Sequence, residues 1–328
     1  MRTSKKVPYR LITNKMFKGF FSNIFSITDA DYSHKLIKIL GIKIRLLKSA
    51  NKNQVAVDYT KYSDITKIPP AEGFLRDYQL ALLAILKEMH RVCEANGIQY
   101  MLSGGTLLGA VRHRGFIPWD DDIDTDMMRE DYDKFAEIFN KSTSNPDLYC
   151  ELWRDKNASA TCIMKIRHKK IAQAFVDIFP LDYCPEKLEG KARKRFNKKV
   201  KFIRKMLSLN PFRINNTQKL LQILKWLSTV VINKNKVADK NTQPQIRWGI
   251  DFPHRWNNWI YDYEQIFPLK KIRFEDYEFY CQNKPESVVT NIYGDYMKFP
   301  KSICPHHSNK EMFSMEELAE LEKLKNLQ

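Results

Sequence analysis

The clearest periodic pattern in the chain lies between residues 74 and 96. Apolar residues recur there at intervals of three or four, at Leu75, Tyr78, Leu82, Ile85, Leu86 and Met89. This spacing predicts one amphipathic helix, and Asn96-Gly97 predicts its end. Short apolar runs at 98–102 and 174–179 predict two buried strands, the second closed by Pro180.

Other segments show weaker patterns of the same kinds. Strict alternation over 42–46 predicts a strand, and 116–126 is expected to be extended. Helices are expected at 131–140, 191–209, 217–233 and 314–328, the last capped by Ser314 with Glu317 three residues later. Residues 51–73 are typical of a linker.

Composition narrows the class of protein. The chain has 328 residues, of which 43% are hydrophobic, so a disordered protein is excluded. The six cysteines lack disulfide or zinc spacing, which favours buried thiols in a reducing compartment. No secretory signal or run of about 20 apolar residues is present. We therefore expect a cytoplasmic protein, or one attached to the inner face of the cytoplasmic membrane.

The net charge of +17 is concentrated in two blocks. Residues 1–60 hold 12 basic and 3 acidic residues, and residues 186–240 hold 16 and 3. A basic face that carries Phe, Leu and Trp favours an anionic membrane surface. A merely solvated face is the alternative, and no nucleic-acid module is recognisable.

The run Trp119-Asp120-Asp121-Asp122-Ile123-Asp124-Thr125-Asp126 carries the most specific chemistry. In an extended strand, alternate side chains share a face, so Asp120, Asp122, Asp124 and Asp126 would lie together. Such carboxylates repel one another unless a cation neutralises them, and Mg²⁺ or Mn²⁺ suits carboxylate oxygens. The alternative is a solvated acidic turn, against which the apolar flanks argue.

A glycine pair precedes the acids. The segment Ser103-Gly104-Gly105-Thr106 follows a predicted strand and begins a short helix, an arrangement that lets backbone N–H groups approach a phosphate. Arg112 and Arg114 lie between this turn and the acids, where they could contact phosphate or simply form an exposed loop. Asp177, inside an apolar strand, is the best third carboxylate, with a structural salt bridge as the alternative. Asp182 is expected in a turn.

The segment 101–124 closely resembles the LicD family of phosphotransferases, of which fukutin-type proteins are distant relatives. Segments 175–182 and 292–296 and Pro305-His306-His307 fit the same family in the same order. The resemblance implies an α/β (α+β) fold over residues 61–328, with a nucleotidyltransferase-type mixed sheet flanked by helices. A basic helical insertion at 186–240 and a basic N-terminal extension at 1–60 would be additions to that core.

The resemblance also implies an activity and assigns roles. It implies transfer of a substituted phosphate, such as phosphocholine or ribitol phosphate, from a CDP-linked donor to a glycan or lipid-linked glycan acceptor. Asp122, Asp124 and Asp177 would hold the metal, and Asp120 would assist catalysis. Donor-binding residues would be Ser103, Gly104, Gly105, Thr106, Arg112, Arg114, His306 and His307. Two other interpretations stay open: a nucleotidyltransferase that releases pyrophosphate, and a scaffold without activity.

Overall fold

The computed structural model describes most of the chain between residues 62 and 327 and three strands before it. The described residues are 25–29, 34–39, 42–47, 62–154, 162–184, 187–208, 216–227, 245–249, 259–300 and 309–327. The chain divides into two compact units, Met1–Asp58 and Tyr59–Gln328. Each unit is described below by itself.

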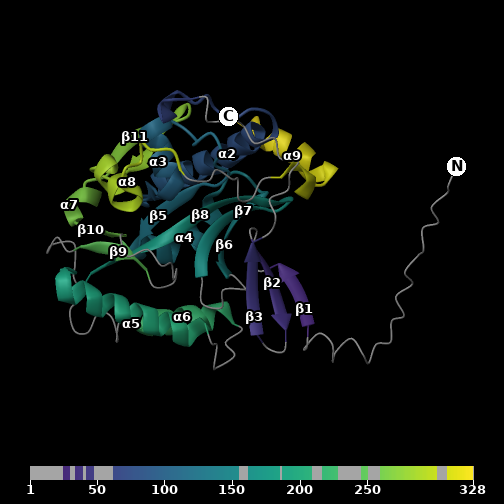
Figure 1. Ribbon diagram of the computed structural model, residues 1–328. Coiled ribbons are helices and arrows are strands. Elements are labelled where there is room, and N and C mark those ends of the chain that lie inside the picture. Colours follow the sequence, from purple (N-terminus) through teal and green to yellow (C-terminus); the bar gives the residue numbers. More distant parts are fainter. Residues whose placement is uncertain are drawn as a thin grey trace. The chain divides into compact units, whose positions relative to one another are not determined.

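Figure 1 shows the helices and strands. In chain order they are β1 (Phe25–Asp29), β2 (His34–Ile39), β3 (Ile42–Leu47), α2 (Gly73–Asn96), β4 (Met101–Leu102), α3 (Gly104–His113), β5 (Asp124–Met128), α4 (Arg129–Ser142), β6 (Leu148–Arg154), β7 (Cys162–His168), β8 (Ile171–Tyr183), α5 (Gly190–Ser208), α6 (Thr217–Leu227), β9 (Ile246–Trp248), β10 (Ile260–Tyr261), α7 (Tyr263–Ile266), β11 (Lys270–Phe274), β12 (Tyr277–Cys281), α8 (Pro285–Tyr293) and α9 (Met315–Lys325). Short 3₁₀ helices lie at Ile65–Lys67 and Lys310–Met312.

The first unit holds a three-stranded antiparallel sheet in the order β1-β2-β3. The strand predicted at 42–46 is confirmed as β3. The sequence analysis missed β1 and β2: the alternation in β1 covers only five residues, and β2 places Leu36 and Ile37 side by side.

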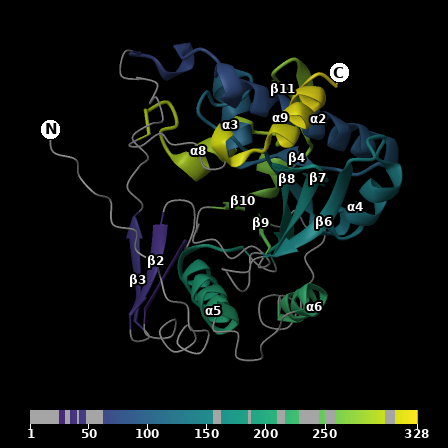
Figure 2. The same ribbon diagram turned by 90° about the vertical axis from the view of Figure 1, so that its right-hand side faces the viewer.

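The second unit is built on a mixed sheet, as predicted from the sequence. Within the described residues its main path runs β10-β9-β8-β5-β4, and the β6–β7 hairpin joins it through β7 and β8. The long strand β8 pairs in parallel with β5 and in antiparallel with β7 and β9. Helices lie on both sides of this curled sheet in Figures 1 and 2. Among the residues that the structure describes, no helix is long and apolar enough to cross a bilayer.

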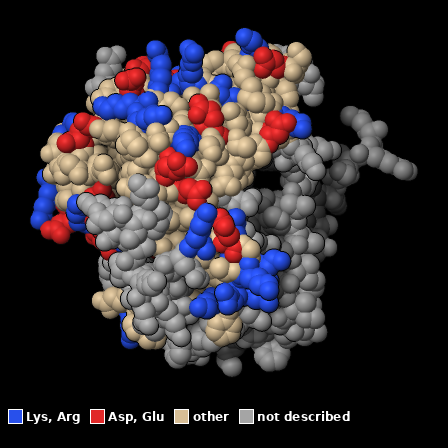
Figure 3. All heavy atoms as spheres, turned by 90° about the vertical axis from the view of Figure 1, so that its left-hand side faces the viewer, with Lys and Arg blue, Asp and Glu red and all other residues tan. Residues whose placement is uncertain are grey.

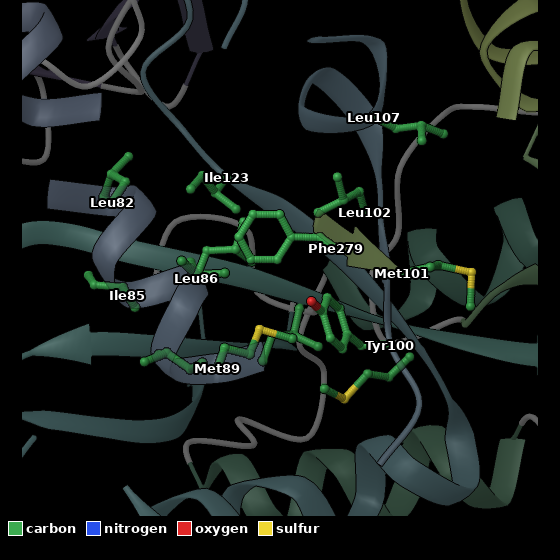
Figure 4. Packing of buried hydrophobic residues seen from close by; sticks show 14 of the residues in the cluster. Leu82, Ile85, Leu86, Met89, Tyr100, Met101, Leu102, Leu107, Ile123 and Phe279 are labelled. Carbon is green, nitrogen blue, oxygen red and sulfur yellow. The ribbon is translucent and has the colours of Figure 1, made fainter. Parts of the chain in front are cut away.

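The predicted long helix is confirmed as α2, which ends at Gly97 with a positive φ of 63°. Its apolar side faces the core, where Leu82, Leu86 and Met89 are fully buried. Figure 4 shows Leu86 beside the Phe279 ring and Met89 extending toward Tyr100. Burying a large apolar side chain stabilises the fold by about 1.5–3 kcal/mol, so this stripe anchors α2 to the strands that carry the acids.

Three predictions about the strands need correction. The acids at 120–122 lie before β5, which begins only at Asp124, so they do not share one strand face with it. Pro180 does not close β8 but lies inside it, opposite Met127, where its carbonyl accepts a hydrogen bond from Gly249 N–H. Asp182 is not in a turn, because β8 continues to Tyr183.

The two basic helices are confirmed as α5 and α6, although the described part of α6 ends at Leu227. Their predicted apolar stripes pack together in a small separate core. Its members are Cys162, Ile203 and Leu220, with Leu152, Phe196, Val200, Ile223 and Leu227 around them. Side chains of α5, α6, β6 and β7 therefore share this small core, and Figure 2 shows both helices below the sheet.

The C-terminal helix and the cysteines also follow the sequence predictions. Helix α9 begins after Ser314, which forms the expected capping box with Glu317. The five cysteines in the described part of the chain are buried and free. Cys304 lies outside it.

Candidate active site

A cavity of about 660 Å³ opens where α3 meets the segment before β5. Three of the predicted acids, Asp120, Asp122 and Asp124, line it together with Gly105 and Arg112. The remaining lining is mostly apolar and aromatic: Leu108, Ile117, Trp119, Tyr293, Asp295, Tyr296, Lys298, Phe299 and Pro300. The fold thus gathers carboxylates from a loop around one cavity, although they do not come from one strand.

The start of α3 fixes the position of Asp124. The N–H of Ser103 donates to the Asp124 carbonyl at 3.0 Å, and the N–H of Asp124 donates to the Thr106 hydroxyl at 2.8 Å. Ser103 and Thr106 are both buried and do not line the cavity. The sequence analysis placed these two residues in a phosphate-binding turn, whereas the structure uses them to join α3 to β5.

The glycine pair leaves room for the carboxylates. A Cβ atom on Gly104 would stand within contact distance of Asp124 Oδ2, and one on Gly105 would stand equally close to Asp120 Oδ2. Gly104 also has a positive φ of 50°, a conformation that other residues rarely adopt. The carboxylates therefore lie directly against the N-terminus of α3, where the helix dipole favours negative charge.

The acids of the cavity raise one another's pKa. Burial raises the pKa of Asp124, and the carboxylates of Asp122, Asp177 and Asp120 raise it further. The pKa of Asp120 is raised in the same way, first by burial and then by Asp122 and Asp121. Crowded carboxylates with raised pKa values are typical of sites where a cation or a proton belongs.

Asp126 stands apart from this group. Its carboxylate accepts a hydrogen bond from the Ser103 hydroxyl at 2.7 Å, and burial raises its pKa to about 8. The side chain is 2% exposed and does not line the cavity. Asp126 therefore helps to hold β5 against α3 from the interior.

Asp177 lies next to Asp124 but is bound to a lysine. The two aspartates are directly paired across the parallel strands β5 and β8. Lys165 of β7 is paired with Asp177 on the other side, and its Nζ lies 2.5 Å from Asp177 Oδ1. The salt bridge that the sequence analysis held as an alternative is thus present, and Asp177 does not line the cavity.

The two predicted arginines separate. Arg112 lines the cavity, donates to the Tyr296 carbonyl and lies 5.9 Å from the Trp119 ring centroid. Burial lowers its pKa to about 10, so it stays charged at neutral pH. Arg114 instead ends α3 in a left-handed conformation, is exposed, and does not line the cavity.

The sequence analysis missed several cavity residues. Trp119, Tyr293, Tyr296 and Lys298 line the cavity without having been assigned a role. The signal was present, because the segment 292–296 had been matched to the family by its order in the chain. His306 and His307 lie outside the described residues.

The donor set suits a hard divalent cation that a substrate helps to hold. Within the described ranges, no three His, Cys, Asp or Glu side chains form a ready metal cluster. Mg²⁺ usually takes only one or two carboxylates and completes its shell with water and substrate phosphates. Asp122 and Asp124, at the mouth of a cavity with a positive Arg112, fit that pattern.

Comparison with known proteins identifies the class. The family model described as LicD/FKTN/FKRP, nucleotidyltransferase domain, matches residues 97–218, which include the glycine pair, the acids and Asp177. The match places the glycine pair and the acids in a domain of the nucleotidyltransferase type.

Similarity to individual proteins then fixes the family. The lipopolysaccharide cholinephosphotransferase LicD of Haemophilus influenzae is 32% identical over 258 residues, which are 71% of this chain and 96% of that protein. The human ribitol 5-phosphate transferase FKRP is 55% identical over 40 residues, 12% of this chain and 8% of its own. An uncharacterised protein of Rickettsia typhi is 48% identical over 59 residues, 18% of this chain and 19% of its own. The chain belongs to the LicD family and is a transferase of substituted phosphate groups.

Proposed function

We propose that this enzyme transfers phosphocholine from CDP-choline to a hydroxyl group of a cell-surface glycan or its lipid-linked precursor. One observation carries the proposal: Asp120, Asp122 and Asp124 converge with Arg112 on one cavity beside the N-terminus of α3. Anionic phosphates suit a helix N-terminus and an arginine, and the carboxylates suit a divalent cation that accompanies those phosphates.

The chain's own residues would divide the work. Asp122 and Asp124 would hold Mg²⁺ or Mn²⁺, which when bound would neutralise charge on the donor phosphates. Arg112 would bind a phosphate oxygen, and the Gly104-Gly105 turn would allow close approach. Asp120, which lines the same cavity, would take the proton from the acceptor hydroxyl. The hydroxyl oxygen attacks phosphorus in line, and CMP leaves.

The aromatic lining supports choline as the head group. Trp119, Tyr293, Tyr296 and Phe299 present rings in the same cavity as the acids. A quaternary ammonium binds to aromatic faces, a preference that neither ribitol nor glycerol shares. Arg112 already lies over Trp119, so this ring accommodates a cation. The similarity to a cholinephosphotransferase over 96% of its length points to the same donor.

A panel of donors tests the proposal. Purified enzyme with Mg²⁺ is mixed separately with CDP-choline, CDP-ribitol, CDP-glycerol and CTP, and CMP and pyrophosphate are measured against an EDTA control. Cation-dependent CMP release from CDP-choline is the expected result. Release from CDP-ribitol or CDP-glycerol alone would overturn the head group, and pyrophosphate from CTP alone would indicate a nucleotidyltransferase.

We further propose that the α5–α6 pair attaches the enzyme to the inner face of an anionic membrane. Phe202 and Trp226 are 65% and 60% exposed, although Ile203 and Leu220 in the apolar stripes of the two helices are buried. The exposed side of α5 also carries Lys191, Lys194, Arg195, Lys198, Lys199 and Lys201. Figure 3 shows Lys and Arg side chains on the lower part of one face, at the height of α5 in Figure 1. Exposed aromatic rings among cations are typical of interfacial helices.

Vesicle co-sedimentation tests this attachment. The enzyme should bind vesicles that contain phosphatidylglycerol, and binding should fall with added salt. The double substitution Phe202→Ser and Trp226→Ser should weaken binding about tenfold, because two rings no longer insert. The matched control Tyr277→Ser removes an exposed ring elsewhere in the same unit and should have no effect. Equal binding to neutral vesicles would contradict the proposal.

A further inference from the structure

The side chain of Lys165 is enclosed by other side chains in the middle of the sheet. Its side chain is 8% exposed, and its Nζ contacts Asp177 Oδ1. The same Nζ lies 3.6 Å from the Phe175 ring centroid and 4.8 Å from the Trp153 ring centroid. Lysine is almost never buried unless it is paired. Here one carboxylate and two aromatic faces replace the water around the ammonium group.

Lys165 lies in one cross-strand row with Asp124, an acid of the cavity. Asp124, Asp177 and Lys165 are directly paired across β5, β8 and β7. Paired residues on neighbouring strands point to the same face of a sheet. The positive charge of Lys165 therefore stands on the far side of Asp177 from Asp124.

This placement matters for the number of cations in the site. A two-metal site for phosphoryl transfer needs carboxylates that bridge or complete two cations about 3.5–4 Å apart. Asp177 is the carboxylate that would serve a second cation beside Asp124. Its Oδ1 is instead bound to an ammonium group, and the described residues contain no cluster of three ligating side chains.

We propose that Lys165 stands in place of a second divalent cation, so that the site takes a single one. Lys165 supplies the fixed positive charge beside Asp177, and the one divalent cation binds at Asp122 and Asp124 with the donor phosphates. Lys165 is a positioning residue, since it acts on the site through Asp177. The inference rests on the proposed function, because it concerns the cation of the same site.

The test counts cations directly. Mn²⁺ is titrated into the full-length enzyme in the presence of CDP, and bound Mn²⁺ is measured by electron paramagnetic resonance. The wild type should bind about one Mn²⁺ per chain. Lys165→Met frees Asp177 and should allow about one more to bind. Lys165→Arg keeps the charge and should retain the wild-type number.

A matched control lies in the neighbouring turn. Lys170 pairs with Asp147 at 2.8 Å on the surface, so Lys170→Met removes a similar pair without touching the site and should leave the count unchanged. Two cations in the wild type would overturn the inference, as would an unchanged count in a folded Lys165→Met variant. If Lys165→Met does not fold, the wild-type and Lys165→Arg counts decide. No bound Mn²⁺ in the wild type would instead contradict the cation of the proposed function.

Discussion

The acids at the two ends of the β5–β8 pair have opposite electrostatic surroundings. Near the C-terminal end, Asp182 accepts hydrogen bonds from Arg129 at 2.8 and 3.2 Å, and Arg247 lies 3.6 Å away. At the other end, the groups that most affect Asp120 and Asp124, apart from burial, are further carboxylates. The first acid has its countercharges built into the fold. The acids of the second group raise one another's pKa values, and they are suited to bind a cation that arrives with a ligand.

The comparison teaches how to separate structural acids from functional ones. A buried carboxylate paired with arginine stabilises the native state only as long as its partner is present. Carboxylates that crowd one another cost stability, and they are retained where a site needs them. Lys165 and Asp177 lie between these cases, since a structural pair there borders directly on the site.

The largest expected effect separates the two ends by activity. Asp124→Asn should lower the rate of CMP release by about a thousandfold, because electrostatic stabilisation of this kind is worth roughly that factor. Thermal stability should stay equal or rise, since one repelling charge is removed. Steady-state rates and thermal unfolding of the same preparation check both parts. An Asp124→Asn variant that keeps its activity, or one that is unfolded, would contradict the proposed difference between the two ends.

The opposite result is expected at the other end. Asp182→Asn leaves Arg129 and Arg247 without their carboxylate and should cost about 3–5 kcal/mol of unfolding free energy. The enzyme that remains folded should still release CMP. Urea unfolding followed by circular dichroism measures the loss, and a change below about 1 kcal/mol would show that the pair is not structural.

A smaller effect is expected from the glycine that borders Asp124. Gly104→Ala combines an unfavourable φ with a clash against the Asp124 carboxylate, and it should lower CMP release more than it lowers stability. Gly97→Ala is the matched control, because Gly97 has a similar positive φ of 63° but nothing within 4 Å of the added Cβ. It should cost only about 1–2 kcal/mol of stability and leave activity intact. Equal activity losses in the two variants would contradict the role of the glycine.

The smallest effect concerns pH. Burial raises the pKa of Asp126 to about 8, and the pKa values of Asp120 and Asp124 are also raised. The folded state then binds protons that the unfolded state releases, so stability is greatest below the unfolded pKa and falls as pH rises through the folded values. Without divalent cations, the melting temperature should decrease from about pH 5 to about pH 9.

Added Mg²⁺ sharpens this test. Binding to ionised Asp122 and Asp124 should favour the folded state at the higher pH and flatten the profile. Differential scanning fluorimetry across the range, with and without Mg²⁺, is the measurement. A melting temperature that rises toward alkaline pH in the cation-free enzyme would show that positive charges of the protein itself stabilise the ionised acids.

Much of this arrangement could be predicted from the sequence, and what could not has physical reasons. Helix α2 and the capping box of α9 could be predicted because both depend on residues that are near one another in the sequence. Three of the four grouped acids do meet, but for a different reason: Asp120 and Asp122 lie before β5, Asp124 begins it, and packing against α3 brings them together, whereas Asp126 is turned away from the cavity. The roles of Ser103 and Thr106 could not be predicted, because a Gly-Gly turn does not specify which hydroxyl bonds to which strand.

The partners of the later acids depend on contacts between distant segments. Asp182 meets Arg247 only because β9 pairs with the end of β8, and Asp177 meets Lys165 through the hairpin partner β7. Proline at 180 indicated a break, but its position in the sheet satisfies the carbonyl through Gly249. Such pairings depend on the strand order, which the local pattern of apolar and polar residues does not determine.

The affinity for CDP-choline, measured by calorimetry with and without Mg²⁺, tests the central claim most directly. The claim is that the acids of the cavity bind a cation that arrives together with the donor phosphates. The wild type should bind CDP-choline at least about tenfold more tightly with Mg²⁺ than with EDTA, and Asp124→Asn should lose that difference while Asp182→Asn keeps it. Equal affinity in Mg²⁺ and EDTA, or a cation effect that survives in Asp124→Asn, would contradict the account.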